Sequence, residues 1–158
     1  MRHFFDTNIL VYAHDRADRA KRDIARACVE EATAEDGFVV SAQVLAEFYW
    51  TAVRLKTMGP SQAQSLVRVW SEHDVVTQTP DLILRAISLH QDHSLAFWDA
   101  MIVQAALDAG CDVLLTEDMQ HDRRFGPLEI RNPFIATGVH EPRSRSYRAN
   151  RGSKRAPR

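Results

Sequence analysis

The sequence predicts a single α/β domain in which helices cover both faces of a parallel β-sheet. Short apolar segments alternate with longer stretches in which apolar residues recur at helical spacing, and this alternation is typical of parallel sheets. A chain of 158 residues, 45% of them hydrophobic, is long enough to bury one core. Because no apolar run approaches the roughly 20 residues of a membrane span, we expect no membrane association.

The first third of the chain predicts two strands and the helices that follow them. Residues 3–5 form a short apolar strand, and the capping residues 6–8 start a helix. Apolar residues at helical spacing predict the next helix over 21–34, and a second strand covers 38–40 after an Asp–Gly turn. A serine cap begins a helix over 42–56, which a Gly–Pro pair ends.

The remaining elements continue this alternation. A helix is expected over 61–70, a third strand at 75–76, and a helix from 80 to about 90 that has proline at its first position. Residues 97–118 then read as a nearly all-apolar helix, a glycine stop, a buried strand over 113–115 and two acids. A last short strand is expected at 128–130.

Acidic residues follow the ends of the first and fourth strands. Asp6 and Asp118 each come directly after a strand, and binding sites in parallel sheets form beyond these carboxyl ends where the strand order reverses. If the two strands are neighbours, the carboxylates meet. Asp6 alone could simply cap the following helix.

Two helices carry further acids. On the helix that begins near residue 97, Asp99 projects roughly 160° from the polar stripe through Gln104 and Asp108, so we expect it to face protein beside a cation. The alternative is an ordinary first-turn acid favoured by the helix dipole. Glu47 shares a polar stripe with Gln43 and Arg54, and periodicity cannot distinguish a cleft wall from a solvated face.

The four acids Asp6, Glu47, Asp99 and Asp118 are compatible with one cleft. Clustered carboxylates repel one another unless a cation neutralises them. Oxygen ligands suit Mg²⁺ or Mn²⁺ rather than zinc. Such an ion could activate water against a phosphodiester.

Four segments carry a family resemblance: DTNILVY (6–12), SAQVLAEF (41–48), FWDAMI (97–102) and LLTEDMQ (114–120). Together they resemble the PIN domain, in particular the VapC toxins of bacterial toxin–antitoxin pairs, over residues 1 to about 135. The resemblance implies a three-layer α/β/α fold with strand order 3-2-1-4-5. It also implies an endoribonuclease dependent on Mg²⁺ or Mn²⁺, a small antitoxin partner and a homodimer.

The resemblance also assigns residues. It places Asp6, Glu47, Asp99 and Asp118 in the catalytic site, with Asp6, Asp99 and Asp118 as metal ligands. Asn8 and Thr116 resemble positions that orient the ligands and waters of the metal. Because the family pattern is Thr, any residue, Asp, Glu117 is expected to point away. The mechanism implied is hydrolysis without a covalent intermediate or a catalytic histidine, and His121 is assigned a structural role.

Charge divides the chain unevenly. Residues 143–158 hold seven basic residues and no acids, which leaves residues 1–142 with 13 bases, 21 acids and a net charge of −8. We therefore predict a nuclease-like domain over 1–138 and a basic, disordered segment over 139–158. That segment is either a phosphate-binding arm or a solvated end without a task. Three arginines are candidates for contacting the RNA backbone: Arg54, Arg123 and Arg124.

Other functional classes fit less well. A non-catalytic RNA-binding or protein-interaction module that retains the PIN fold is the main alternative, and its RNA binding would persist in EDTA. The segment 6–8 lacks the second Asp of an aspartyl-phosphate phosphatase, and no glycine-rich turn follows the first strand to bind a dinucleotide. Cys28 and Cys111 lack metal-binding spacing, so we expect reduced thiols in a cytoplasmic protein. The N-terminus reaches an acid too early for a signal peptide.

Overall fold

The structure of this protein is a computed structural model that describes residues 1–135. The predicted boundary at residue 138 and the basic segment 139–158 lie outside these residues. Within the described range, no helix combines the length and the apolar character needed to cross a membrane.

The centre of the fold is one six-stranded sheet within residues 1–135, in the order β3-β2-β1-β4-β6-β5. Its strands are β1 (His3–Phe5), β2 (Phe38–Ser41), β3 (Asp74–Val76), β4 (Val113–Leu115), β5 (Arg124–Phe125) and β6 (Leu128–Arg131). All neighbours pair in parallel except β5 and β6. The predicted order 3-2-1-4-5 is confirmed, with β6 as the expected fifth strand. The two-residue strand β5 is an addition that the sequence pattern did not predict.

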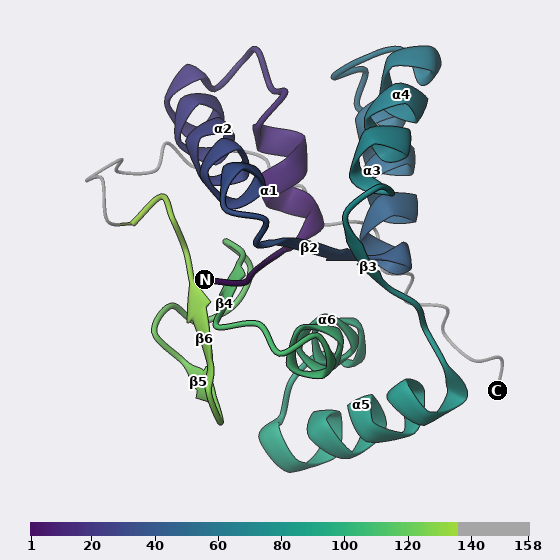
Figure 1. Ribbon diagram of the computed structural model, residues 1–158, viewed down its shortest axis with the longest axis vertical. Helices are drawn as coiled ribbons and strands as arrows, with labels where there is room; N and C mark the ends of the chain where they lie inside the picture. Colours follow the sequence, from purple (N-terminus) through teal and green to yellow (C-terminus); the bar gives the residue numbers. More distant parts are fainter. Residues whose placement is uncertain (136–158) are drawn as a thin grey trace, which may run out of the picture.

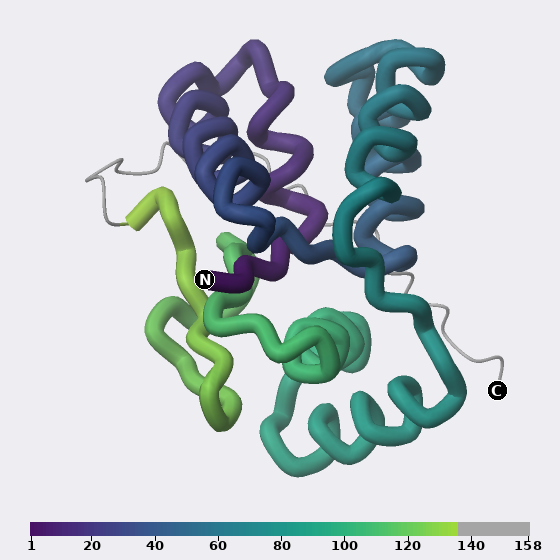
Figure 2. The backbone as a smooth tube through the Cα atoms, viewed as in Figure 1, coloured from purple at the N-terminus to yellow at the C-terminus, as the bar shows by residue number. Residues whose placement is uncertain are grey.

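Six helices within the described residues form the outer layers: α1 (Thr7–Tyr12), α2 (Arg19–Ala34), α3 (Ala42–Arg54), α4 (Pro60–Trp70), α5 (Pro80–His93) and α6 (Phe97–Asp108). Helices α1 to α4 lie on one side of the sheet and α5 and α6 on the other, so the predicted three-layer arrangement is confirmed (Figure 1). The backbone trace shows β1 passing through the middle of the fold between these layers (Figure 2).

The core lies around β1, which has neighbours on both sides. Phe4 aligns with Val39 of β2 and with Leu114 of β4, and all three side chains are fully buried. Phe5 stacks on Phe38, with ring centroids 4.8 Å apart. The packing of this three-residue strand fixes where the chain leaves the sheet, and therefore the position of Asp6, the next residue.

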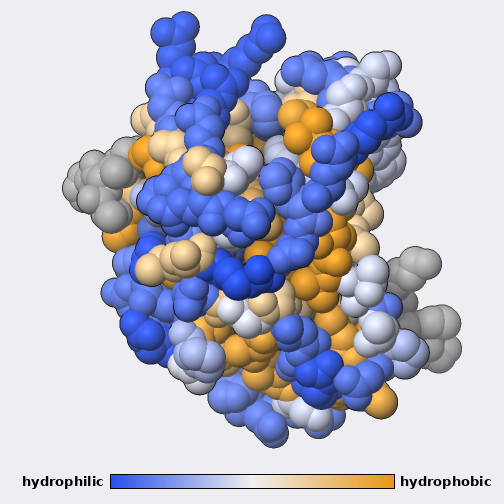
Figure 3. All heavy atoms as spheres, in the orientation of Figure 1, coloured by the Kyte–Doolittle hydropathy of each residue, from blue (hydrophilic) through white to orange (hydrophobic). Residues whose placement is uncertain are grey.

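The predicted polar stripe on α6 is only partly exposed to solvent, at Asp108. Gln104 is only 8% exposed, because α5 packs over this side of the helix. Gln104 donates a hydrogen bond to Asp108, and Asp108 forms an ion pair with Arg85 of α5. The polar residues therefore join two helices. Hydrophobic side chains remain visible over α5 and α6 on the face shown in Figure 3, while hydrophilic ones cover the upper helices.

Candidate functional site

The carboxyl ends of β1 and β4 meet at one edge of the sheet. Phe5 aligns with Leu115, and the backbone N–H of Asp6 donates to the Leu115 carbonyl at 3.0 Å. Asp6 is only 1% exposed, and its Oδ1 atom accepts a hydrogen bond from the Thr7 backbone N–H at 2.7 Å. Asp6 therefore caps α1 with one carboxylate oxygen and presents the other to the neighbouring strand.

Asn8 connects the two strand ends. Its Nδ2 atom lies 3.3 Å from Asp6 Oδ2, 3.2 Å from Thr116 Oγ1 and 3.2 Å from Asp118 Oδ2. Thr116 Oγ1 also donates to Asp6 Oδ2 at 2.8 Å and accepts from the Asp118 backbone N–H at 3.2 Å. The carboxylates of Asp6 and Asp118 thus share one amide donor. The distance between their acceptor oxygens is therefore at most the sum of the two hydrogen-bond lengths.

Glu47 extends this network to α3. Thr7 Oγ1 donates to Glu47 Oε2 at 3.2 Å, and Gln43 Nε2 donates to Glu47 Oε1 at 2.9 Å. Gln43 is held in turn by Gln78, which donates to its Oε1 atom at 2.9 Å. Glu47 is half-buried and contacts Thr7, the residue after Asp6, at the start of α1. It therefore does not lie on a fully solvated face.

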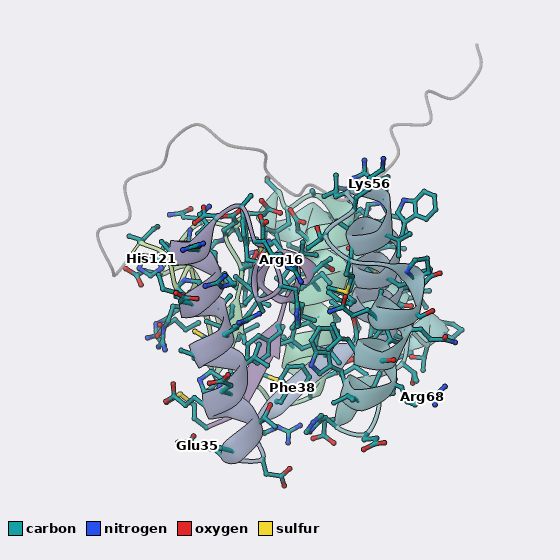
Figure 4. All side chains as sticks on the ribbon, turned by 90° about the horizontal axis from the view of Figure 1, so that it is seen from above. Arg16, Glu35, Phe38, Lys56, Arg68 and His121 are labelled. Atoms are coloured by element: carbon teal, nitrogen blue, oxygen red, sulfur yellow. The ribbon has the colours of Figure 1, made fainter. Side chains whose placement is uncertain are left out.

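The direction of α3 explains this position. Seen from above, Lys56, which follows α3, lies at the opposite end of the molecule from Phe38, which begins β2, and from Glu35, which follows α2 (Figure 4). Helix α3 therefore leads away from the start of β2, and Glu47 contacts Thr7 just after the end of β1. Ser41 starts this helix by accepting a hydrogen bond from the Val44 backbone N–H at 3.2 Å.

Asp99 belongs to the other helical layer, on α6. Because β4 follows α6 after a short turn at Gly110, α6 runs back along the sheet and begins near the carboxyl ends of the strands. Asp99 lies in the first turn of α6 and is half-buried. The helix has no side-chain cap at Ala96.

The predicted RNA-contacting arginines lie in different surroundings. Arg54 is exposed at the end of α3. Arg123 donates to the His93 carbonyl at 2.9 Å and lies over the Phe125 ring, and Arg124 pairs with Glu129 at 2.6 Å. The last two guanidinium groups thus have contacts that support the β5–β6 hairpin.

Two side chains that lie near Asp118 in the sequence have contacts outside the network of Asp6, Asn8 and Asp118. His121 Nδ1 accepts a hydrogen bond from the Asn132 backbone N–H at 3.1 Å. Glu117 points away from Asp118, toward Tyr12 and Lys21.

Lys21 is a buried charged residue that was not among the predicted site residues. Its side chain is only 6% exposed and pairs with Glu117, with 2.6 Å between Nζ and Oε2. The signal that could have found it is its place on α2, because Lys21 continues the spacing of the buried Ala25 and Ala32 and the half-buried Cys28. A lysine on the buried stripe of a helix requires an anionic partner.

A divalent metal requires several oxygen ligands that face one point. Among residues 1–135, no three His, Cys, Asp or Glu side chains are grouped so that they could hold a metal ion. The oxygens of Asp6 and Asp118 nevertheless face a common region through Asn8, and carboxylate oxygens are the ligand type that Mg²⁺ and Mn²⁺ prefer. The chemistry of these donors fits a hard cation at this edge.

Comparisons with known proteins agree with the fold described above. The family model of the PIN domain matches residues 3–124. No curated protein sequence matches the chain at a significant level.

Solved structures share the fold at 20% sequence identity. A toxin–antitoxin complex from Klebsiella pneumoniae matches with a TM-score of 0.62, over 83% of this chain and 97% of that chain. VapC20 of Mycobacterium tuberculosis, a toxin that cleaves the sarcin–ricin loop, matches with a TM-score of 0.57, over 71% and 86%. VapBC2 of Rickettsia felis, bound to a DNA fragment from its promoter, matches with a TM-score of 0.60, over 84% and 98%.

Proposed function

Because this chain belongs to the PIN domain family, we propose that it is a metal-dependent endoribonuclease and the toxin of a toxin–antitoxin pair. The observation that carries the proposal is the shared contact of Asp6 and Asp118 with Asn8, at the junction of β1 and β4. Two of the three solved structures named above contain a toxin with its antitoxin, and the third is an RNA-cleaving toxin. Their likeness supports the assignment to this group.

The proposed ligands of the ion are Asp6, Asp99 and Asp118, with Glu47 as a further catalytic acid. A bound Mg²⁺ or Mn²⁺ would lower the pKa of a water molecule and offset negative charge on the leaving oxygen of the phosphodiester. Asn8 and Thr116 orient the Asp6 and Asp118 carboxylates through the hydrogen bonds described above. They do so as neutral donors, so the cluster keeps the negative charge that attracts a divalent cation.

The test is RNA cleavage by variants that remove one carboxylate charge. We expect Asp6→Asn and Asp99→Asn to abolish Mn²⁺-dependent cleavage while the domain stays folded, as judged by circular dichroism. Asp23→Asn is the matched control, because Asp23 is an exposed carboxylate on α2 whose partner is the adjacent Arg22. Cleavage retained in both site variants would exclude the carboxylate mechanism.

Substrate and mechanism class can be tested together. The purified protein is incubated with total cellular RNA in Mn²⁺ or in EDTA, and new 5′ ends are mapped. We expect discrete ends that appear only with the metal. RNA binding that persists in EDTA, with no product under either condition, would instead identify a non-catalytic RNA-binding module.

The predicted partners need separate experiments. A small co-encoded protein that co-purifies with the chain and blocks cleavage would support the antitoxin. Light scattering on the purified protein tests the homodimer. A monomer that cleaves RNA and retains no small partner would contradict both assignments and leave the nuclease assignment intact.

A further inference from the structure

Glu117 lies between the two site residues Thr116 and Asp118 but faces the opposite way. Its Oε1 atom accepts a hydrogen bond from the Tyr12 hydroxyl at 2.6 Å, and its Oε2 atom pairs with Lys21 Nζ at 2.6 Å. Lys21 Nζ also donates to the Tyr12 hydroxyl at 3.3 Å. The three side chains close a triangle that joins α1, α2 and the segment after β4.

This triangle is buried. The side chains of Lys21 and Glu117 are 6% and 12% exposed. The ammonium group of Lys21 lies 4.6 Å from the centre of the Tyr12 ring and 5.0 Å from that of Phe134. A buried ion pair is weak evidence for stability. Its charge-assisted hydrogen bonds are directional, however, so this pair can fix the position of the Glu117 side chain.

The triangle acts on the same peptide segment that Asn8 holds from the other side. The backbone N–H of Glu117 faces Asn8 Oδ1 at 3.4 Å, and that of Asp118 donates to Thr116 Oγ1. Thr116 to Asp118 is thus fixed by Asn8 on the site side and by Lys21 and Tyr12 on the other. Rotation of this segment would bring the Glu117 carboxylate toward the site in place of Asp118.

We propose that Lys21, through Glu117, is a positioning residue for the Asp118 carboxylate. By holding Glu117 against α1 and α2, Lys21 keeps the segment in the orientation in which Asp118 and Asp6 share Asn8. This inference rests on the proposed function, because it assigns Asp118 to a site for a divalent cation. Lys21 acts through its contacts with Glu117 and Tyr12, neither of which is a proposed metal ligand.

The metal affinity of the purified full chain tests this role, with Mn²⁺ as the probe and free Mn²⁺ counted by electron paramagnetic resonance. Loss of residues that support a metal ligand typically weakens metal affinity by about 10- to 100-fold, and we expect a loss in that range for Lys21→Met. A charge effect alone predicts the opposite sign, because removing a cation near an acidic site tightens cation binding. Arg22→Met is the matched control, since it removes the same charge from the next position of α2.

Tyr12→Phe provides a second, uncharged variant. It removes one hydrogen bond to Glu117 and leaves the net charge unchanged, so we expect weaker Mn²⁺ binding here too. It decides the question if Lys21→Met fails to fold.

Weaker binding in the folded triangle variants and unchanged binding in Arg22→Met would support the inference. Unchanged or tighter binding in the triangle variants, with normal binding in the parent, would overturn the positioning role alone. A parent protein that binds no Mn²⁺ would overturn the proposed metal site and the positioning role with it.

Discussion

Thr51, in the last turn of α3, provides a test of the packing of this helix. Its side chain is fully buried, and its hydroxyl has no hydrogen-bond partner among the residues that the structure describes. A buried hydroxyl without a partner costs about 1–3 kcal/mol of folding free energy. Valine has nearly the same shape and a similar helix propensity. We therefore expect Thr51→Val to raise the free energy of unfolding by about 1–2 kcal/mol.

Urea unfolding measures this change as a higher midpoint at an unchanged slope. For a chain of this length, each kcal/mol raises the melting temperature by about 2–4 °C. Thr116→Val is the matched control with the opposite sign. Thr116 is equally buried, but its hydroxyl donates to Asp6 and accepts from two N–H groups.

Because hydrogen bonds to charged groups contribute about 1.5–3 kcal/mol, Thr116→Val should lose at least that much stability. The contrast between the two threonines is the decisive result. If Thr51→Val were neutral or destabilising, the inference that the Thr51 hydroxyl is buried without a hydrogen-bond partner would be refuted.

Two further predictions concern titratable groups away from the site. Burial lowers the pKa of His14 from its usual value near 6.5, so the unfolded chain binds more protons in acid; stability should hold above about pH 6.5 and fall below it. His14→Phe should reduce the loss of urea midpoint between pH 7 and pH 5, with His3, whose pKa burial also lowers, leaving a residual loss. Burial raises the pKa of the Cys111 thiol to about 12. A Cys28→Ser variant should therefore react with a thiol reagent at pH 8 only after unfolding, and prompt reaction would contradict the burial of Cys111.

The five parallel strands were predictable from the sequence because apolar residues dominate each of them, whereas the two-residue strand β5 (Arg124–Phe125) has no such pattern. Helix ends were less predictable, and the reason is a backbone conformation. Helix α3 stops at Arg54 rather than at residue 56, and Lys56 has φ +56°. Helix α5 continues to His93 and is ended by Ser94 with φ +54°. Left-handed residues that are not glycine leave no mark in composition, whereas Gly110, with φ +64°, was identified as a stop.

Some contacts of the candidate site were predictable from the sequence and others were not. The contact between the ends of β1 and β4 follows from strand order, so the approach of Asp6 to Asp118 could be expected. The surroundings of Glu47 could not, since the polar stripe of α3 is the same for a cleft wall and for a solvated face. The partner of Lys21 could not either, because pairing across 96 residues depends on how α2 lies over the sheet.

The placement of charge around the strand junction meets one physical requirement of the proposed cation site. Two carboxylates that accept from one side chain could be held by a lysine, but an ammonium group would neutralise them and repel a metal. Asn8 orients both oxygens without a charge. The buried lysine of this region instead pairs with Glu117, the one carboxylate of the segment that faces away. A neutral residue at 21 and a cation at 8 would place the positive charge beside Asp6 and Asp118, where it would weaken binding of a metal ion. In the observed arrangement the charged pair lies on the far side of the segment from Asn8, which avoids this repulsion.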